Sequence, residues 1–228
     1  MNKDFNVLRK LLIELLLVWG ILFLVVYTHS EAATTCLATH FAPQVSILAT
    51  NVLAPLLIPI QIAIDLSFFL LIPVALLQLW RFVVPGLFVG EKTIFTVVLI
   101  ISLGLFLIGL GFGWGLILPF VFSLLSSTLP TKMIWAPTWQ SYYEFILKVE
   151  VFFGLAFQIP LIMGLLVRTS IVSMARIKEI RAYAVVGAFT LGMLVTPPDV
   201  TSQILVAIPL CLLFELGVML GYLLQPKI

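Results

Sequence analysis

The chain has 228 residues, of which 62% are hydrophobic and only 10% are charged, and its mean hydropathy is +1.24. Soluble domains carry about 25% charged residues, so this composition excludes an ordinary soluble domain and predicts a protein that faces lipid. The net charge of +2, without any basic run or stripe, argues against nucleic-acid binding. The two cysteines, Cys36 and Cys211, predict neither a disulfide framework nor a metal site.

Hydropathy predicts six membrane spans in one transmembrane domain that covers residues 1–228. We assign the spans as helices because only helices and closed barrels satisfy the backbone in lipid, and continuous apolar runs lack the alternation of a barrel. The predicted spans are residues 11–27, 60–80, 95–118, 142–167, 182–195 and 202–224. The first span is too long for a signal-peptide core and is interrupted by Glu14, so we interpret it as retained. The fifth is only about 20 Å long, against about 30 Å of hydrocarbon, so it is predicted to be short.

The distribution of lysine and arginine predicts the orientation. Six spans place both termini and the loops at residues 81–94 and 168–181 on one side of the membrane. Every basic residue except Lys132 and Lys148 belongs to that side. The positive-inside rule therefore predicts that both termini are cytoplasmic. On the other side, residues 28–59 and 126–140 are predicted as outer loops.

The common motifs of catalysis are absent from the sequence. It contains no phosphate-binding loop, no HExxH metal motif and no GxSxG nucleophile elbow. We therefore expect neither an enzyme nor a cofactor nor a metal. Several glycines in the third and sixth spans predict close packing between helices; they are Gly109, Gly111, Gly113, Gly115, Gly217 and Gly221.

Polar residues at membrane depth are the candidate functional residues, because they are costly to bury in lipid. Gln158 lies in the middle of the fourth span and forms either an interhelical hydrogen bond or a functional contact. Glu215 in the sixth span is neutral, paired across helices or exposed to a watery cavity. Glu144 and Lys148 have the spacing of a helical ion pair, which we expect them to form.

Three separated segments resemble the TatC family. They are residues 73–92 (PVALLQLWRFVVPGLFVGEK), residues 152–160 (FFGLAFQIP) and residues 192–217 (GMLVTPPDVTSQILVAIPLCLLFELG). TatC is the receptor component of the twin-arginine translocase, which moves folded proteins across bacterial or thylakoid membranes. The resemblance covers about residues 45–225. It implies an all-α fold in which six transmembrane helices form a curved, concave wall with short helices five and six.

The resemblance also implies a signal-peptide site around Glu91, which corresponds to the family carboxylate that engages the twin-arginine motif. A carboxylate suits this role because guanidinium binds it in a planar fork that ammonium cannot copy. Phe82 and Pro85 are expected to shape the same surface.

The N-terminal motif of the family is only partly present. Leu8 and Arg9 match it, Val7 stands where the family has a glutamate, and Lys10 keeps a second positive charge one position early. The resemblance therefore implies that Leu8, Arg9 and Lys10 belong to the signal-peptide surface. A second carboxylate for the paired arginines is missing unless Asp4 supplies it.

Two further regions receive roles from the resemblance. Gln158 corresponds to a family Glu or Gln that contacts a single-span partner of the TatA/TatB type or an inserted signal peptide. Thr196, Pro197, Pro198 and Asp199 form a tight outer loop. The prolines end span five, and Asp199 can cap the next helix. This structural role leaves docking of a partner open.

The resemblance implies a receptor subunit in a multi-copy complex of the bacterial cytoplasmic membrane. Such a subunit is expected to bind Arg–Arg signal peptides on the cytoplasmic face and to use the proton-motive force to export folded proteins. A secondary transporter of small solutes is the alternative from another class, and it predicts internal repeats. No convincing repeat relates residues 1–118 to residues 119–228. A third possibility, a pure scaffold, would leave Glu91 dispensable.

Overall fold

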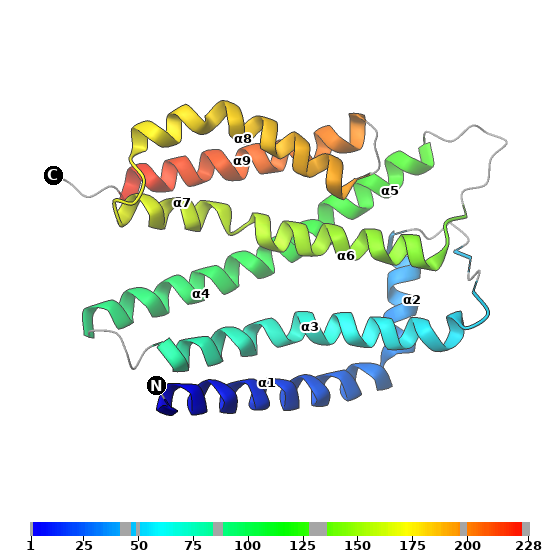
Figure 1. The fold of residues 1–228 in the computed structure, drawn as a ribbon. Coiled ribbons are helices and arrows are strands. Elements are labelled where there is room, and N and C mark those ends of the chain that lie inside the picture. Colours follow the sequence, from blue (N-terminus) through cyan, green and yellow to red (C-terminus); the bar gives the residue numbers. More distant parts are fainter. Residues whose placement is uncertain are drawn as a thin grey trace. The chain divides into compact units, whose positions relative to one another are not determined.

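The structure is a computed structural model that describes residues 2–41, 47–48, 51–83, 89–127, 136–196 and 200–224. Within these ranges most of the chain is helical, and the one β-type pairing is an isolated bridge between Leu48 and Thr138. The predicted all-α fold is therefore confirmed. The helices, shown in Figure 1, are α1 (Asn2–Thr28), α2 (Ser30–Phe41), α3 (Ala54–Val83), α4 (Val89–Phe112), the π-helical turn η2 (Gly113–Ile117), α5 (Leu118–Ser127), α6 (Trp139–Ala156), α7 (Ile159–Arg168), α8 (Met174–Val195) and α9 (Val200–Leu224).

Five helical segments among the described residues are long and apolar enough to cross a membrane. They are Arg9–Thr28, Ala54–Gln78, Lys92–Ser127, Trp139–Arg168 and Val200–Leu224. With α8 as the sixth, the count agrees with the predicted six spans.

Helix α8 begins well before the predicted fifth span. It has 22 residues and starts at Met174. Ser173 is its N-cap, and the Ser173 Oγ atom accepts a hydrogen bond from the backbone N–H of Arg176 at 3.4 Å. Such N-cap bonds stabilise helix starts. The first turns carry Lys178 and Arg181, so hydropathy detects only the apolar remainder, residues 182–195. The short span is thus the second part of a longer helix.

Helix α2 lies where the sequence predicts an outer loop. Its threonines hydrogen-bond to carbonyls one turn earlier: Thr34 Oγ1 donates to Ser30 O at 2.7 Å, and Thr39 Oγ1 donates to Thr35 O at 2.8 Å. A polar segment can therefore be helical without the apolar run that marks a span. Hydropathy identifies long apolar spans, and it therefore gave no indication of this short, more polar helix within residues 28–59.

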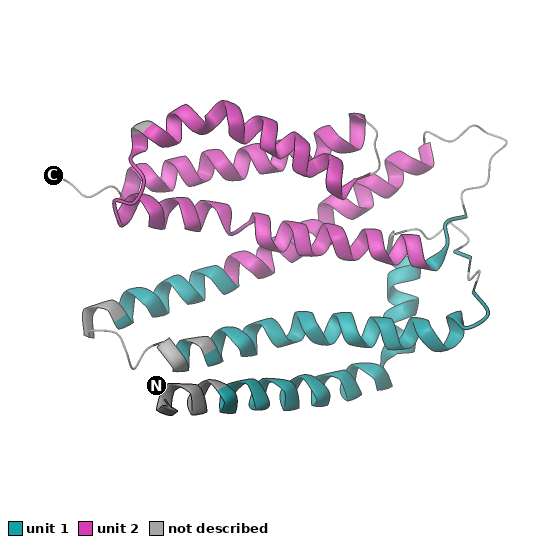
Figure 2. Cartoon of the chain, in the orientation of Figure 1, with its two compact units in different colours: residues 1–103, 136–139 teal, residues 104–135, 140–228 magenta. Residues whose placement is uncertain are grey.

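The chain forms two compact units, coloured separately in Figure 2. Unit 1 comprises Met1–Leu103 and Ala136–Trp139, and unit 2 comprises Gly104–Trp135 and Gln140–Ile228. In unit 1, α1 packs along α3, and the rings of Trp19 and Phe68 lie 5.3 Å apart between their centroids.

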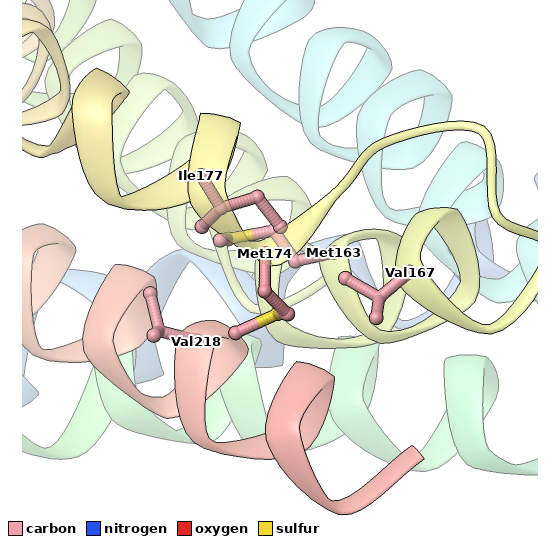
Figure 3. Packing of buried hydrophobic residues seen from close by; sticks show 5 residues of the cluster. All are labelled: Met163, Val167, Met174, Ile177 and Val218. Carbon is pink, nitrogen blue, oxygen red and sulfur yellow. The ribbon is translucent and has the colours of Figure 1, made fainter. Parts of the chain in front are cut away.

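In unit 2, α9 packs against both α7 and α8. Figure 3 shows the apolar cluster where they meet: Met163, Val167, Met174, Ile177 and Val218. A Cβ at Gly217 would lie only 2.6 Å from Met163 Sδ. The absence of a side chain at Gly217 therefore lets α9 approach α7 closely, as predicted for small residues in membrane helices.

Candidate functional site

Five of the six predicted signal-peptide residues belong to three helices. Glu91 is in the first turn of α4, Phe82 is in the last turn of α3, and Leu8 is in α1. The side chains of these three residues lie outside the described part of the structure, as does the whole of Pro85. The structure thus gives their positions along the helices and leaves their contacts open.

A hydrogen-bonded chain joins the end of α3 to the beginning of α4. Trp80 Nε1 donates to Thr96 Oγ1 at 2.9 Å, and Thr96 Oγ1 donates to Lys92 O at 2.7 Å. Both bonds are partly buried, and a buried donor or acceptor left without a partner costs about 1–3 kcal/mol. The chain therefore holds the first turns of α4, which carry Glu91, against the end of α3. The motif contained Trp80, but no sequence signal pointed to Thr96.

Two basic residues of the predicted surface are described on α1, and both are exposed. Lys10 Nζ lies 4.0 Å from Glu14 Oε1, with 79% and 38% of the two side chains exposed. Exposed ion pairs contribute little, typically about 0.2–1 kcal/mol. Lys10 is thus partly neutralised by Glu14, while no described ion pair involves Arg9.

Gln158 lies at a break in the fourth apolar segment, between α6 and α7. The break follows from Pro160, which has no N–H for the carbonyl of Ala156. Around it, Gln158 N donates to Leu155 O at 3.0 Å in place of the helical partner one residue further back, and Ile162 N donates to Gln158 O at 2.9 Å. The half-buried Gln158 therefore sits where the helix is locally irregular. The sequence predicted one helix here.

Glu215 is paired across helices, which was one of its three predicted states. Arg181 Nη2 donates to Glu215 Oε2 at 2.7 Å, and 49% of each side chain is exposed. One end of the same helix pair is also linked by Lys178 Nζ, which lies 5.3 Å from the ring centroid of Tyr222. Both contacts join α8 to α9, so Glu215 has an internal structural partner.

We expect a double-mutant cycle on Arg181 and Glu215 to show coupling. Arg181→Gln and Glu215→Gln should each lower the thermal stability of the purified protein, and the double variant should lose less than the sum. The coupling should be about 0.5–1 kcal/mol, since the pair is short but half exposed. The looser pair of Lys10 and Glu14 is the matched control and should show less. Additive losses at Arg181 and Glu215 would mean that the pair contributes nothing.

The predicted outer loop is described only at its edges. Thr196 is buried and is the C-cap of α8. Its backbone N–H and its Oγ1 hydroxyl both donate to Gly192 O, at 2.9 and 3.0 Å. Gln203 Nε2 of α9 donates to Phe189 O at 2.9 Å. Pro197, Pro198 and Asp199 lie outside the described residues. The described contacts thus tie the start of α9 back to α8.

The acidic residues of α6 differ from the prediction. Glu144 Oε1 accepts a hydrogen bond from Gln140 Nε2 at 2.7 Å, and no ion pair joins Glu144 to Lys148. The predicted ion pair was wrong, and Glu144 instead bonds the amide of Gln140, one turn earlier. Glu150 is only 8% exposed, which the sequence did not indicate. Within the described ranges, no group of three or more His, Cys, Asp or Glu side chains is placed to hold a metal ion.

The comparisons with known proteins agree with these observations. A family model described as Sec-independent protein translocase protein (TatC) matches residues 5–209. TatC of Haemophilus influenzae is 39% identical over 182 residues, which cover 80% of this chain and 71% of the relative. TatC of Azotobacter chroococcum is 35% identical over 206 residues, covering 90% and 81%.

A solved structure extends this likeness to the fold. The crystal structure of a protein described as the twin arginine translocase receptor TatC has a TM-score of 0.79 and 31% sequence identity to this chain. The match covers 97% of this chain and 99% of the solved one. The resemblance inferred from the three motifs is thereby confirmed: the chain belongs to the TatC family of Sec-independent protein translocase proteins.

Proposed function

We propose that this chain is the receptor subunit of a twin-arginine translocase and binds Arg–Arg signal peptides through Glu91. The observation that carries the proposal is the likeness, over 97% of the chain, to a solved protein described as the twin arginine translocase receptor. Membership of a protein-transport family confirms the prediction that the chain is not an enzyme. Transport would be driven by the proton-motive force, which fits a sequence without a nucleotide-binding motif.

The proposed orientation places both termini in the cytoplasm. It is supported by the basic residues, since the positive-inside rule assigns to the cytoplasm the loops that are rich in Lys and Arg. Helix α8 adds support, because its first turns carry Arg176, Lys178 and Arg181, so the basic residues of this helix gather at its start. The first turn of α4, with Glu91, then belongs to the cytoplasmic side as well.

Glu91 is the residue we propose for the contact with the signal peptide. A carboxylate accepts two parallel hydrogen bonds from a guanidinium, whereas an ammonium offers only a point charge. The bonds from Trp80 to Thr96 and from Thr96 to Lys92 O hold the turn that carries Glu91. Because Val7 replaces the family glutamate in α1, Glu91 should account for most of the discrimination between arginine and lysine.

Peptide binding to the purified protein tests this function. We expect an Arg–Arg signal peptide to bind the protein in lipid nanodiscs about tenfold or more tightly than its Lys–Lys version, equivalent to about 1.4 kcal/mol. Fluorescence anisotropy of labelled peptides measures both affinities. Equal affinities would contradict the assignment of this chain as the receptor.

Gln158 is proposed to contact a single-span partner of the TatA/TatB type in a multi-copy complex. The local break at Pro160 supports this role, because it leaves the backbone irregular around a half-buried polar side chain. Polar contacts between membrane helices contribute about 0.6–2 kcal/mol.

We expect Gln158→Leu to lower recovery of a TatB-type partner about three- to tenfold while the protein still inserts into the membrane. Co-purification from membranes measures recovery. Gln158→Glu is the matched control, since the family pattern accepts either residue, and it should preserve recovery. Full recovery with Leu at this position would exclude a role for Gln158 in partner binding.

A further inference from the structure

A hollow of about 560 Å³ lies between α1 and α3 in unit 1. Its lining includes Glu14 and Leu17 from α1 and Leu77, Gln78, Trp80 and Arg81 from α3. Pockets of this size bind small molecules in many proteins, usually through apolar walls and a few placed polar groups. This hollow has the same character, because one carboxylate, one guanidinium and one amide line it together with leucines.

The hollow lies close to one end of the apolar segments of α1 and α3, where lipid headgroups would meet the protein. The apolar part of α3 ends at Gln78, and that of α1 begins at Arg9, so Glu14 and Arg81 are both near the ends of their spans. Leu17 is 63% exposed and Leu77 is 56% exposed. These leucines offer contact to acyl chains, while the polar residues stand at the level of headgroups.

Gln78 supplies a second, independent observation. Its side chain is only 8% exposed, and its Oε1 atom is buried without a hydrogen-bond partner among the described residues. Buried acceptors are nearly always satisfied, and leaving one unpaired is destabilising. Because Oε1 has almost no accessible surface, an N–H donor of a ligand in the hollow reaches it only if the Gln78 side chain rotates toward the hollow.

The charges in and beside the hollow define the ligand further. Glu14 attracts a cation, whereas Arg81 attracts a phosphate, which guanidinium binds through parallel hydrogen bonds. A headgroup with both an ammonium and a phosphate complements this arrangement, with the ammonium at Glu14 and the phosphate at Arg81. We propose that the hollow is a binding site for phosphatidylethanolamine, whose acyl chains lie against Leu17 and Leu77.

An arginine from a bound peptide is the competing occupant. It could also donate to Glu14 and Gln78. However, it would bring a further cation beside Arg81, and Lys10 already lies 4.0 Å from Glu14. Like charges in such proximity oppose binding. The ammonium of a zwitterionic lipid also comes close to Lys10, but the phosphate of the same headgroup meets Arg81 and offsets the added positive charge.

Lipid selectivity of the purified, full-length protein tests the proposal. The protein is placed in nanodiscs of equimolar phosphatidylethanolamine, phosphatidylcholine and phosphatidylglycerol, and retained lipids are counted by native mass spectrometry. We expect phosphatidylethanolamine to be retained at least fivefold over phosphatidylcholine, whose quaternary ammonium has no N–H donor. Glu14→Gln should abolish this preference, and Arg81→Gln should lower retention of all three lipids. Glu144→Gln, which removes a carboxylate on α6, is the control and should change nothing.

Three results would overturn the proposal. Equal retention of phosphatidylethanolamine and phosphatidylcholine would show that Glu14 does not distinguish a primary ammonium from a quaternary ammonium. A preference for phosphatidylglycerol that survives Glu14→Gln would indicate attraction to basic side chains only. Displacement of the retained lipid by an Arg–Arg peptide, with peptide affinity lost in Glu14→Gln, would make the hollow a peptide site. The lipid measurement needs no peptide, so it stands or fails independently of the receptor function.

Discussion

Replacing Glu91 with glutamine is expected to abolish crosslinking of an Arg–Arg signal peptide to this protein in native membranes. The substitution keeps the size of the side chain and removes the charge that would hold a guanidinium. Truncating one partner of a hydrogen-bonded charge pair at an interface costs about 2–5 kcal/mol, which corresponds to a loss of about thirtyfold or more in affinity. A photoreactive group placed beside the twin arginines of the peptide measures the contact.

The controls for Glu91 separate its charge from general effects on the membrane protein. Glu91→Asp keeps the carboxylate on a shorter side chain and should retain part of the crosslinking. Glu31→Gln removes a carboxylate from the first turn of α2 and should leave crosslinking unchanged. Crosslinking of Glu91→Gln at the level of the unmodified protein would remove Glu91 from the site and favour a pure scaffold.

Alanine at Gly109 should destabilise unit 2 strongly. A Cβ at Gly109 would lie 2.5 Å from Phe153 O and 3.0 Å from Gly154 Cα, both of which are backbone atoms of α6. The backbone of a helix cannot yield locally, so α4 and α6 must separate or the chain must fold with strain. Overpacking of this kind costs about 1–3 kcal/mol. Thermal unfolding of the purified protein should show a clear fall in the melting temperature.

Gly111 is the matched control for Gly109 on the same helix. A Cβ at Gly111 would meet nothing within 4 Å. Alanine there should be neutral or stabilising by up to about 1 kcal/mol, since glycine is the weaker helix former. Equal melting temperatures for the two alanine variants would show that the close approach of α4 to α6 does not contribute to stability.

The sequence predicted the fold well wherever lipid contact produced a continuous apolar run. The spans in α3, α4 and α9 were found this way. It predicted less where the helix was polar or irregular. In helix α2 the threonine hydroxyls bond carbonyls of the same helix, and hydropathy does not register such bonds. The break at Gln158 had a visible cause in Pro160, which could have been used to predict it.

The candidate site was predictable through motifs and not through pairwise contacts. Glu91 came from the resemblance of residues 73–92. The bond from Trp80 to Thr96 joins residues on different helices, and no spacing rule relates them. The partner of Glu215 was left open for the same reason, since Arg181 lies 34 positions away in the chain. Contacts along one helix were also imperfectly predicted, because Gln140 rather than Lys148 reached Glu144.

Export of a folded reporter tests the receptor function most directly. The reporter carries an Arg–Arg signal or its Lys–Lys version, and it is expressed in cells that lack the native receptor and in the same cells after this chain is supplied with its partners. We predict export of the Arg–Arg reporter only when the chain is present, and no export of the Lys–Lys reporter in either case. Equal export of the two reporters, or no export of either when the chain is restored, would contradict the proposed function.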